Sequence, residues 1–172
     1  MKKRASGSGA KARATTVRVA VVQASPILFD RAATVRKAVR LIREAAGNGA
    51  RIILLPEAFV SGYPRGLGFG TVMGSRSPAG REAFRAYWES AVEVPGPDTL
   101  ALGAASKAAR AYVAIGVIER DGKPGGGTLY CTLLYFDPEG RLVAKHRKLK
   151  PTGSERLVWG EGDGSTLSVV DT

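Results

Sequence analysis

The chain has 172 residues, of which 44% are hydrophobic and 24% charged, and its formal net charge is +11. This composition is typical of a globular protein with a real core, and it excludes an intrinsically disordered chain. No apolar run approaches the roughly 18 to 20 residues of a membrane-spanning helix, so we expect no membrane partner and a cytoplasmic location. The single cysteine, Cys131, excludes an internal disulfide and any multi-cysteine metal site.

Almost half of the positive excess lies at the N-terminus. Residues 1–16 contain five lysines and arginines, no acidic residue, and many Gly, Ser and Ala residues. We expect this segment to be a disordered basic tail, followed by part of one domain over residues 17–172. A basic tail attracts polyanions without specificity, but this one carries no aromatic side chains and no motif that reads a nucleic acid. We therefore expect no specific nucleic-acid partner.

The first part of the domain alternates between strand and helix signals. Residues 17–23 form a β-branched run that predicts a strand, and residues 52–55 form a second apolar run of this kind. Between them, apolar residues recur at helical spacing after Asp30, which is suited to be the N-cap. This order predicts a βαβ unit with parallel strands. Chemistry in such sheets gathers at the carboxyl ends of the strands, where Gln23 and Glu57 both fall.

The later segments predict a loop, two helices and several further strands, without repeats and without a second domain. The Gly-rich stretch has almost no periodicity and is long enough to be a functional surface loop. Asp98 is the expected N-cap of the second of these helices, and the last strand stops soon after it begins. In chain order the predicted elements are the loop 61–78, the helices 79–92 and 98–110, and the strands 111–120, 128–136, 141–148 and 165–172.

Glu57 is the first candidate for chemistry, because it follows directly on the buried run Ile52–Leu55. Desolvating a carboxylate is costly unless a partner compensates its charge. A structural interpretation makes it a helix cap or an ion-pair partner at the edge of the sheet. A catalytic interpretation requires a partner, for which Lys148 and Glu155 are the best candidates. Taken alone, the basic run Lys145–Lys150 is typical of a solvated surface.

Cys131 and His146 belong to two further residue types that can act in catalysis. Cys131 lies in the middle of a predicted strand, on a face shared with apolar residues. Neither a cationic residue nor a helix start is next to it in the sequence to activate the thiol, so we interpret it as a structural core residue. His146 is the only histidine, and no G-x-S-x-G segment supplies a serine nucleophile, which argues against a Ser-His-Asp triad.

Five segments, in order from Val17 to the last residues, resemble the nitrilase branch of the carbon–nitrogen hydrolase superfamily. They read "VAVVQASP", "LLPEAFVSGYPRG", "GREAFRAYWESAVEVPGP", "TLYCTLLYFDPEG" and "KHRKLKPTGSERLVWGEGDGST". The segments "GYPRG" and "HRKLKPT" make the pattern closer to the nitrilases proper than to the amidase or carbamoylase branches. The resemblance implies an α/β fold, the four-layer αββα sandwich of the nitrilase type, incomplete here because the C-terminal part is absent.

The resemblance also implies the roles of three charged residues. The family uses a Glu–Lys–Cys triad, in which Glu57 matches the general base and Lys148 the lysine that stabilises the intermediate. Glu155 matches a second glutamate held near that lysine. The family's nucleophile lies in a "CWE"-like segment, whereas this chain ends at Thr172, before any such segment. Since Cys131 falls outside the "CWE"-like position, the resemblance implies an N-terminal fragment that lacks its nucleophile and is inactive alone.

The implied reaction converts a small-molecule nitrile to a carboxylic acid and ammonia through a cysteine thioimidate and an acyl-enzyme. It requires no metal and no organic cofactor, and the full-length relatives commonly form homo-oligomers. Two alternatives remain open at this point. One is a non-catalytic binding or regulatory protein that retains the fold, and the other is a basic nucleic-acid-binding domain.

Overall fold

The computed structural model describes residues 16–75, 77–122 and 126–172. The predicted basic tail lies outside these residues, apart from Thr16. In chain order the elements are β1 (Val19–Val21), α1 (Arg31–Gly47), β2 (Ile52–Leu54), α2 (Pro78–Glu89), β3 (Val92–Glu93), α3 (Pro97–Ala109), β4 (Tyr112–Arg120), β5 (Leu129–Phe136), β6 (Leu142–Arg147) and the 3-10 helix η1 (Gly153–Leu157).

The strands of the described residues form one mixed sheet in the order β1-β2-β4-β5-β6, with β3 pairing to the end of β4. Strands β1, β2 and β4 are parallel, and β5 and β6 continue the sheet in antiparallel pairing. Helix α1 connects β1 to β2, which confirms the predicted βαβ unit. The parallel part therefore brings the carboxyl ends of β1 and β2 to the same side of the sheet.

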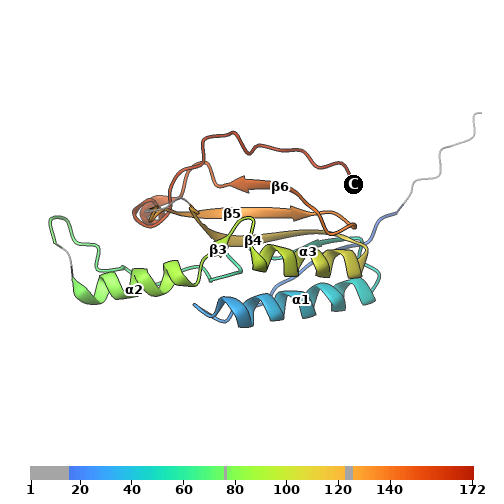
Figure 1. The fold of residues 1–172 in the computed structure, drawn as a ribbon, viewed down its shortest axis with the longest axis horizontal. Helices are drawn as coiled ribbons and strands as arrows, with labels where there is room; N and C mark the ends of the chain where they lie inside the picture. The colour runs from blue at the N-terminus through green and yellow to red at the C-terminus, as the bar shows by residue number, and fades with distance from the viewer. Residues whose placement is uncertain (1–15, 76, 123–125) are drawn as a thin grey trace, which may run out of the picture.

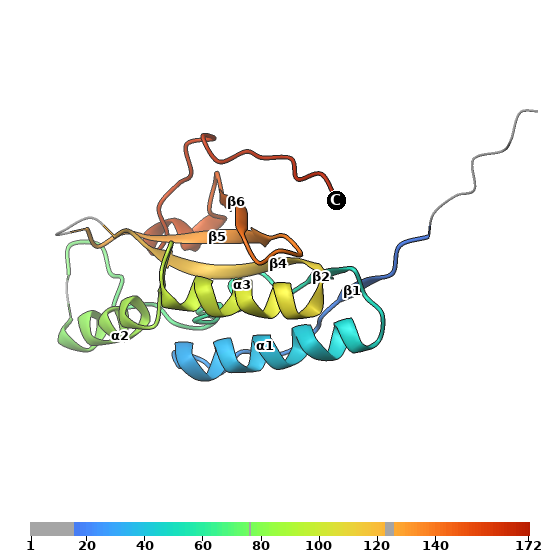
Figure 2. The same cartoon turned by 45° about the vertical axis from the view of Figure 1, so that its right-hand side comes forward.

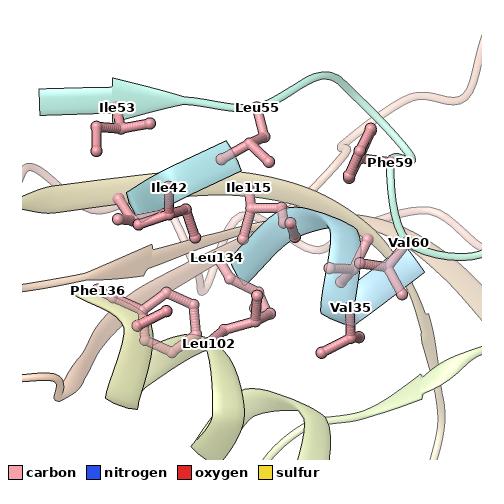
Figure 3. Packing of buried hydrophobic residues seen from close by; sticks show 14 of the residues in the cluster. Val35, Ile42, Ile53, Leu55, Phe59, Val60, Leu102, Ile115, Leu134 and Phe136 are labelled. Carbon is pink, nitrogen blue, oxygen red and sulfur yellow. The ribbon is translucent and has the colours of Figure 1, made fainter. Parts of the chain in front are cut away.

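Helices α1 and α3 lie side by side on one face of the sheet (Figures 1 and 2). Asp30 caps α1, since its carboxylate accepts a hydrogen bond from the Ala33 N–H, as predicted. Apolar residues of both helices pack against the sheet (Figure 3). Completely burying one such aliphatic side chain contributes about 1.5 to 3 kcal/mol. The labelled members of this core are Val35, Ile42, Ile53, Leu55, Phe59, Val60, Leu102, Ile115, Leu134 and Phe136.

The opposite face of the sheet is open at the end that β1 and β2 form. Along β1 and β2, Val21 is 72% exposed and Leu54 is 39% exposed. They alternate with residues such as Ile53, which point toward the helices and are completely buried. Apolar surface of this kind in a sheet is a site of association or aggregation.

We expect the 172-residue chain alone to self-associate through this open face. Replacing Val21 with lysine should weaken the association, because a charge would then lie on the surface that has to lose water. Sedimentation at several protein concentrations measures the effect. Leu100→Lys is the matched control, because Leu100 is 74% exposed on α3 on the other side of the molecule. If the wild-type chain were monomeric at all concentrations and melted reversibly, the prediction would be contradicted.

Three helical predictions differ from the structure near α2 and α3. Helix α2 begins at Pro78 after the N-cap Ser77, and it ends at Glu89 rather than at residue 92. Val92–Glu93 instead form β3, which pairs with the end of β4. The N-cap of α3 is Gly96, so Asp98 lies in the first turn and not at the cap. A carboxylate in the first turn still interacts favourably with the helix dipole.

The strand predicted over residues 165–172 is wrong. This segment has no regular secondary structure, and Val169 is 94% exposed. A strand requires a neighbouring strand for its backbone hydrogen bonds, and none of the described strands pairs with this segment. Sequence pattern alone does not reveal whether such a partner is present.

Candidate active site

Glu57 leaves the plane of the sheet in a short bulge that follows β2. The Gly116 N–H donates to the Pro56 carbonyl at 3.1 Å, and the Gly116 carbonyl accepts from the Val60 N–H at 3.2 Å. Residues 57–59 lie between these two hydrogen bonds and are looped out from β4. Ala58 has a φ of 50°, a conformation that is uncommon for a residue with a side chain. The bulge therefore projects Glu57 from the sheet.

The absence of a side chain at Gly116 allows this arrangement. A Cβ atom there would lie 2.4 Å from the Pro56 carbonyl oxygen and 2.6 Å from the Glu57 Cα atom. Both neighbours are backbone atoms, so a larger residue would have to displace the bulge. The position of Glu57 thus depends on a glycine in the middle of the adjacent strand.

Lys148 lies between two carboxylates. Its Nζ atom is 2.9 Å from Glu57 Oε1 and 2.8 Å from Glu155 Oε2. Lys148 directly follows β6, and its backbone N–H donates to the Cys131 carbonyl at 2.8 Å, which extends the pairing between β5 and β6. The contact expected between Glu57 and this distant lysine is therefore confirmed, and Glu155 reaches the same ammonium from η1.

Both oxygens of Glu155 are occupied by donors. Tyr63, from the Gly-rich loop, donates its hydroxyl to Oε1 at 2.8 Å, and the Thr152 N–H donates to Oε2 at 2.6 Å. Burial raises the pKa of Glu155, but Lys148, Thr152 and Tyr63 outweigh it and the net pKa is lowered. The hydrogen bond to Glu155 raises the pKa of Tyr63. Glu155 is therefore a fixed anion that orients Lys148, and Tyr63 is a site residue that the sequence did not reveal.

The Lys148 ammonium is a stable positive charge. Its partial burial lowers the pKa, but the hydrogen bonds to Glu155 and Glu57 outweigh this and raise the pKa above its ordinary value. The side chain is 26% exposed, whereas that of Glu57 is 53% exposed. Its Nζ atom also lies 5.7 Å from the centre of the Trp159 ring. The arrangement holds a cation beside a carboxylate that remains accessible.

Cys131 is both a core residue and a member of this cluster. It is 5% exposed and packs with Ala58 and Tyr87, as expected for a structural residue. Its thiol also donates to Glu57 Oε1, with an Sγ to oxygen distance of 3.4 Å. Burial and the neighbouring Glu57 raise the pKa of the thiol to about 12. Glu57 lies 74 residues away from Cys131 in the chain, so the residues adjacent to Cys131 give no sign of this contact.

A cavity of about 570 Å³ opens on the uncovered face above these residues. Its lining is largely apolar, which fits a site for a small organic molecule. A second cavity of about 590 Å³ lies between the Gly-rich loop and η1, and Tyr63, Glu155 and Trp159 line it. The lining of the first cavity comprises Val21, Val22, Gln23, Leu54, Leu55, Pro56, Glu57, Gly116, Cys131, Thr132, Leu133, His146 and Lys148.

Within the described ranges, no three His, Cys, Asp or Glu side chains are grouped so that they could hold a metal ion. None of the helices in the same part of the chain is long and apolar enough to cross a membrane.

The single cysteine makes the charge balance of this site measurable. Glu57→Gln should lower the pKa of the Cys131 thiol, because the carboxylate raises it. At any pH below about 12 the thiolate fraction then rises, and alkylation by iodoacetamide should become several-fold faster. Mass spectrometry of the alkylated chain measures the rate across the alkaline range. Glu161→Gln is the matched control, because Glu161 pairs with Lys150 and not with a residue of this cluster. Equal rates for wild type and Glu57→Gln would contradict the prediction.

Comparison with known proteins identifies the class to which this fold and site belong. Residues 18–172 match the family model described as Carbon-nitrogen hydrolase, and the chain therefore belongs to this family. The chain is 52% identical over 157 residues to the bifunctional nitrilase/nitrile hydratase NIT4B of Nicotiana tabacum, covering 91% of the chain and 44% of that protein. It is 54% identical over 158 residues to the aliphatic nitrilase of Sinorhizobium fredii, covering 92% of the chain and 50% of that protein.

Solved structures of the same superfamily share the fold. An amidase from Nesterenkonia sp. superposes with a TM-score of 0.61 at 19% identity, over 91% of this chain and 52% of that one. A CN-hydrolase superfamily protein from Xanthomonas campestris superposes with a TM-score of 0.60 at 24% identity, over 85% of this chain and 46% of that one. The α/β fold predicted from the resemblance is thus confirmed. The chain spans about half the length of the curated relatives it matches.

Proposed function

We propose that this chain supplies the general base and the lysine of a nitrilase, which converts a small-molecule nitrile to a carboxylic acid and ammonia. The observation that carries the proposal is the placement of Lys148 between Glu57 and Glu155 at an apolar cavity. The identity of 52% and 54% to nitrilases supports the choice of a nitrile as substrate. Homo-oligomerisation of the complete protein is part of the same proposal.

The proposed first step is attack of a cysteine thiolate on the nitrile carbon. The nucleophile in this proposal is a cysteine C-terminal to Thr172, because Cys131 is buried and its thiol pKa is raised to about 12. Glu57 accepts the proton of the attacking thiol, which gives a thiolate strong enough for a weakly electrophilic carbon. The nitrile nitrogen gains the negative charge and takes up a proton, which leaves a thioimidate.

Two molecules of water complete the proposed reaction. The first adds to the thioimidate carbon, the carbon–nitrogen bond breaks, and ammonia leaves to give a thioester acyl-enzyme. The second hydrolyses the thioester, which releases the carboxylic acid and the cysteine thiol. Glu57 takes the proton from each attacking water. The fixed Lys148 ammonium stabilises the negative charge that develops on nitrogen and then on oxygen, as the donors of an oxyanion hole do.

A chimera tests this proposal directly. This chimera joins the 172-residue chain to the C-terminal half of the Sinorhizobium fredii aliphatic nitrilase. We expect it to release ammonia from an aliphatic nitrile, while the 172-residue chain alone and the Glu57→Gln chimera release none. The amide of the same acid is assayed in parallel. A folded chimera that forms no ammonia under conditions where the parent nitrilase does would overturn the proposal.

A further inference from the structure

The buried thiol of Cys131 has no task in the reaction just described, although it contacts the proposed general base. The strand β5 places it there: Cys131 pairs with Ile118 of β4, and its carbonyl accepts the Lys148 N–H at 2.8 Å. This backbone hydrogen bond holds the main chains of the two residues side by side. Both donors come from neighbouring positions in the sheet and converge on one carboxylate.

The two donors share a single oxygen of Glu57. Lys148 Nζ is 2.9 Å and Cys131 Sγ is 3.4 Å from Oε1. No described residue donates a hydrogen bond to the other oxygen, Oε2, and the Glu57 side chain is 53% exposed toward the open cavity. The carboxylate is thus held at one atom and accessible at the other. A general base needs this arrangement, because an oxygen that already accepts two hydrogen bonds is poorly placed to accept a proton.

The thiol is suited to be a permanent donor. Burial, together with Glu57, raises its pKa to about 12, so it keeps its proton at neutral pH. It adds no charge, and it therefore orients the carboxylate without competing with Lys148 for the role of counter-ion. A cysteine that only filled space would not need to point its sulfur at a carboxylate oxygen.

We propose that Cys131 is a positioning residue for the general base: its thiol and Lys148 hold Oε1 of Glu57, so that Oε2 accepts the proton. The inference rests on the proposed nitrilase function for its catalytic part, while the hydrogen bond itself is testable without any turnover. Cys131 does not contact the reacting atoms and acts through Glu57.

The first test uses infrared spectroscopy of the 172-residue chain. Because Cys131 is the only cysteine, the S–H stretching band belongs to one thiol. We expect the band to move to higher frequency in Glu57→Gln, since a neutral amide oxygen accepts a weaker hydrogen bond than a carboxylate. Glu161→Gln should leave the band unchanged. An identical band in wild type and Glu57→Gln would overturn the proposal.

The second test measures turnover in the chimera. Cys131→Ala should lower kcat about three- to tenfold with KM unchanged, and Cys131→Ser, which keeps a donor, should restore most of the loss. Circular dichroism and thermal melting establish that each variant folds. Equal kcat values in the Ala and Ser variants would overturn the positioning role. A chimera without any turnover, with the band still shifted by Glu57→Gln, would overturn the proposed nitrilase function and leave the hydrogen bond established.

Discussion

Replacing Lys148 with methionine in the chimera is expected to lower kcat about 10³-fold. Methionine retains the length and apolar stem of lysine but carries no charge. The variant leaves Glu57 and Glu155 as two carboxylates with no cation between them, and it removes the donor that stabilises the developing negative charge. Steady-state ammonia release measures the loss.

Lys150→Met is the matched control for this prediction. Lys150 is two residues away, 70% exposed, and pairs with Glu161 rather than with a residue of the site. We expect its kcat to remain within about twofold of wild type, since exposed ion pairs contribute little. If Lys148→Met and Lys150→Met lost activity equally, general charge rather than the position of the ammonium would explain the effect.

Replacing Glu119 with glutamine in the chimera should lower the free energy of unfolding by about 3 kcal/mol. Glu119 of β4 is 1% exposed and accepts hydrogen bonds from Thr132 of β5 and from Lys145 and Arg147 of β6. The variant removes the carboxylate with which both partly buried cations pair. Urea denaturation measures the difference. Glu139→Gln is the control, because Glu139 is 64% exposed and, among the described residues, forms its ion pair with Arg141.

The contribution of Glu119 should depend on pH in a defined direction. Burial raises the pKa of its carboxyl group, but the hydrogen bonds from Arg147, Lys145 and Thr132 outweigh burial, and the folded-state pKa lies below the ordinary 4.5. The stabilisation is therefore complete above pH 4.5 and is lost as the pH falls through the folded-state pKa. The difference between wild type and Glu119→Gln should shrink on acidification. A difference that is constant with pH would contradict this assignment.

Short stretches of sequence were sufficient to predict those elements whose structure depends on nearby residues. The cap at Asp30, the βαβ unit and the placement of Glu57 after β2 all follow from short stretches of sequence. The contact between Glu57 and Lys148 joins residues 91 positions apart, which no local periodicity connects. The resemblance to a known family is what places these two residues in one site.

Features that depend on which strands become neighbours were not accessible from the sequence. Cys131 reaches Glu57 only because β4 separates β2 from β5 and carries a glycine at the point where the bulge crosses it. Tyr63 reaches Glu155 from a loop without periodicity. The segment 165–172 shows the reverse case, since its β-branched residues suggest a strand but no described strand pairs with it.

The open side of the sheet also sets the strength of the attraction between Lys148 and Glu57. Water has access to both side chains, and its high dielectric constant and dissolved ions weaken the force between the two charges. Any protein layer that covered this face would exclude that water, and the same two atoms, still 2.9 Å apart, would then attract each other more strongly. Shielding from solvent, without any movement, would thus be enough to change the electrostatics of the site.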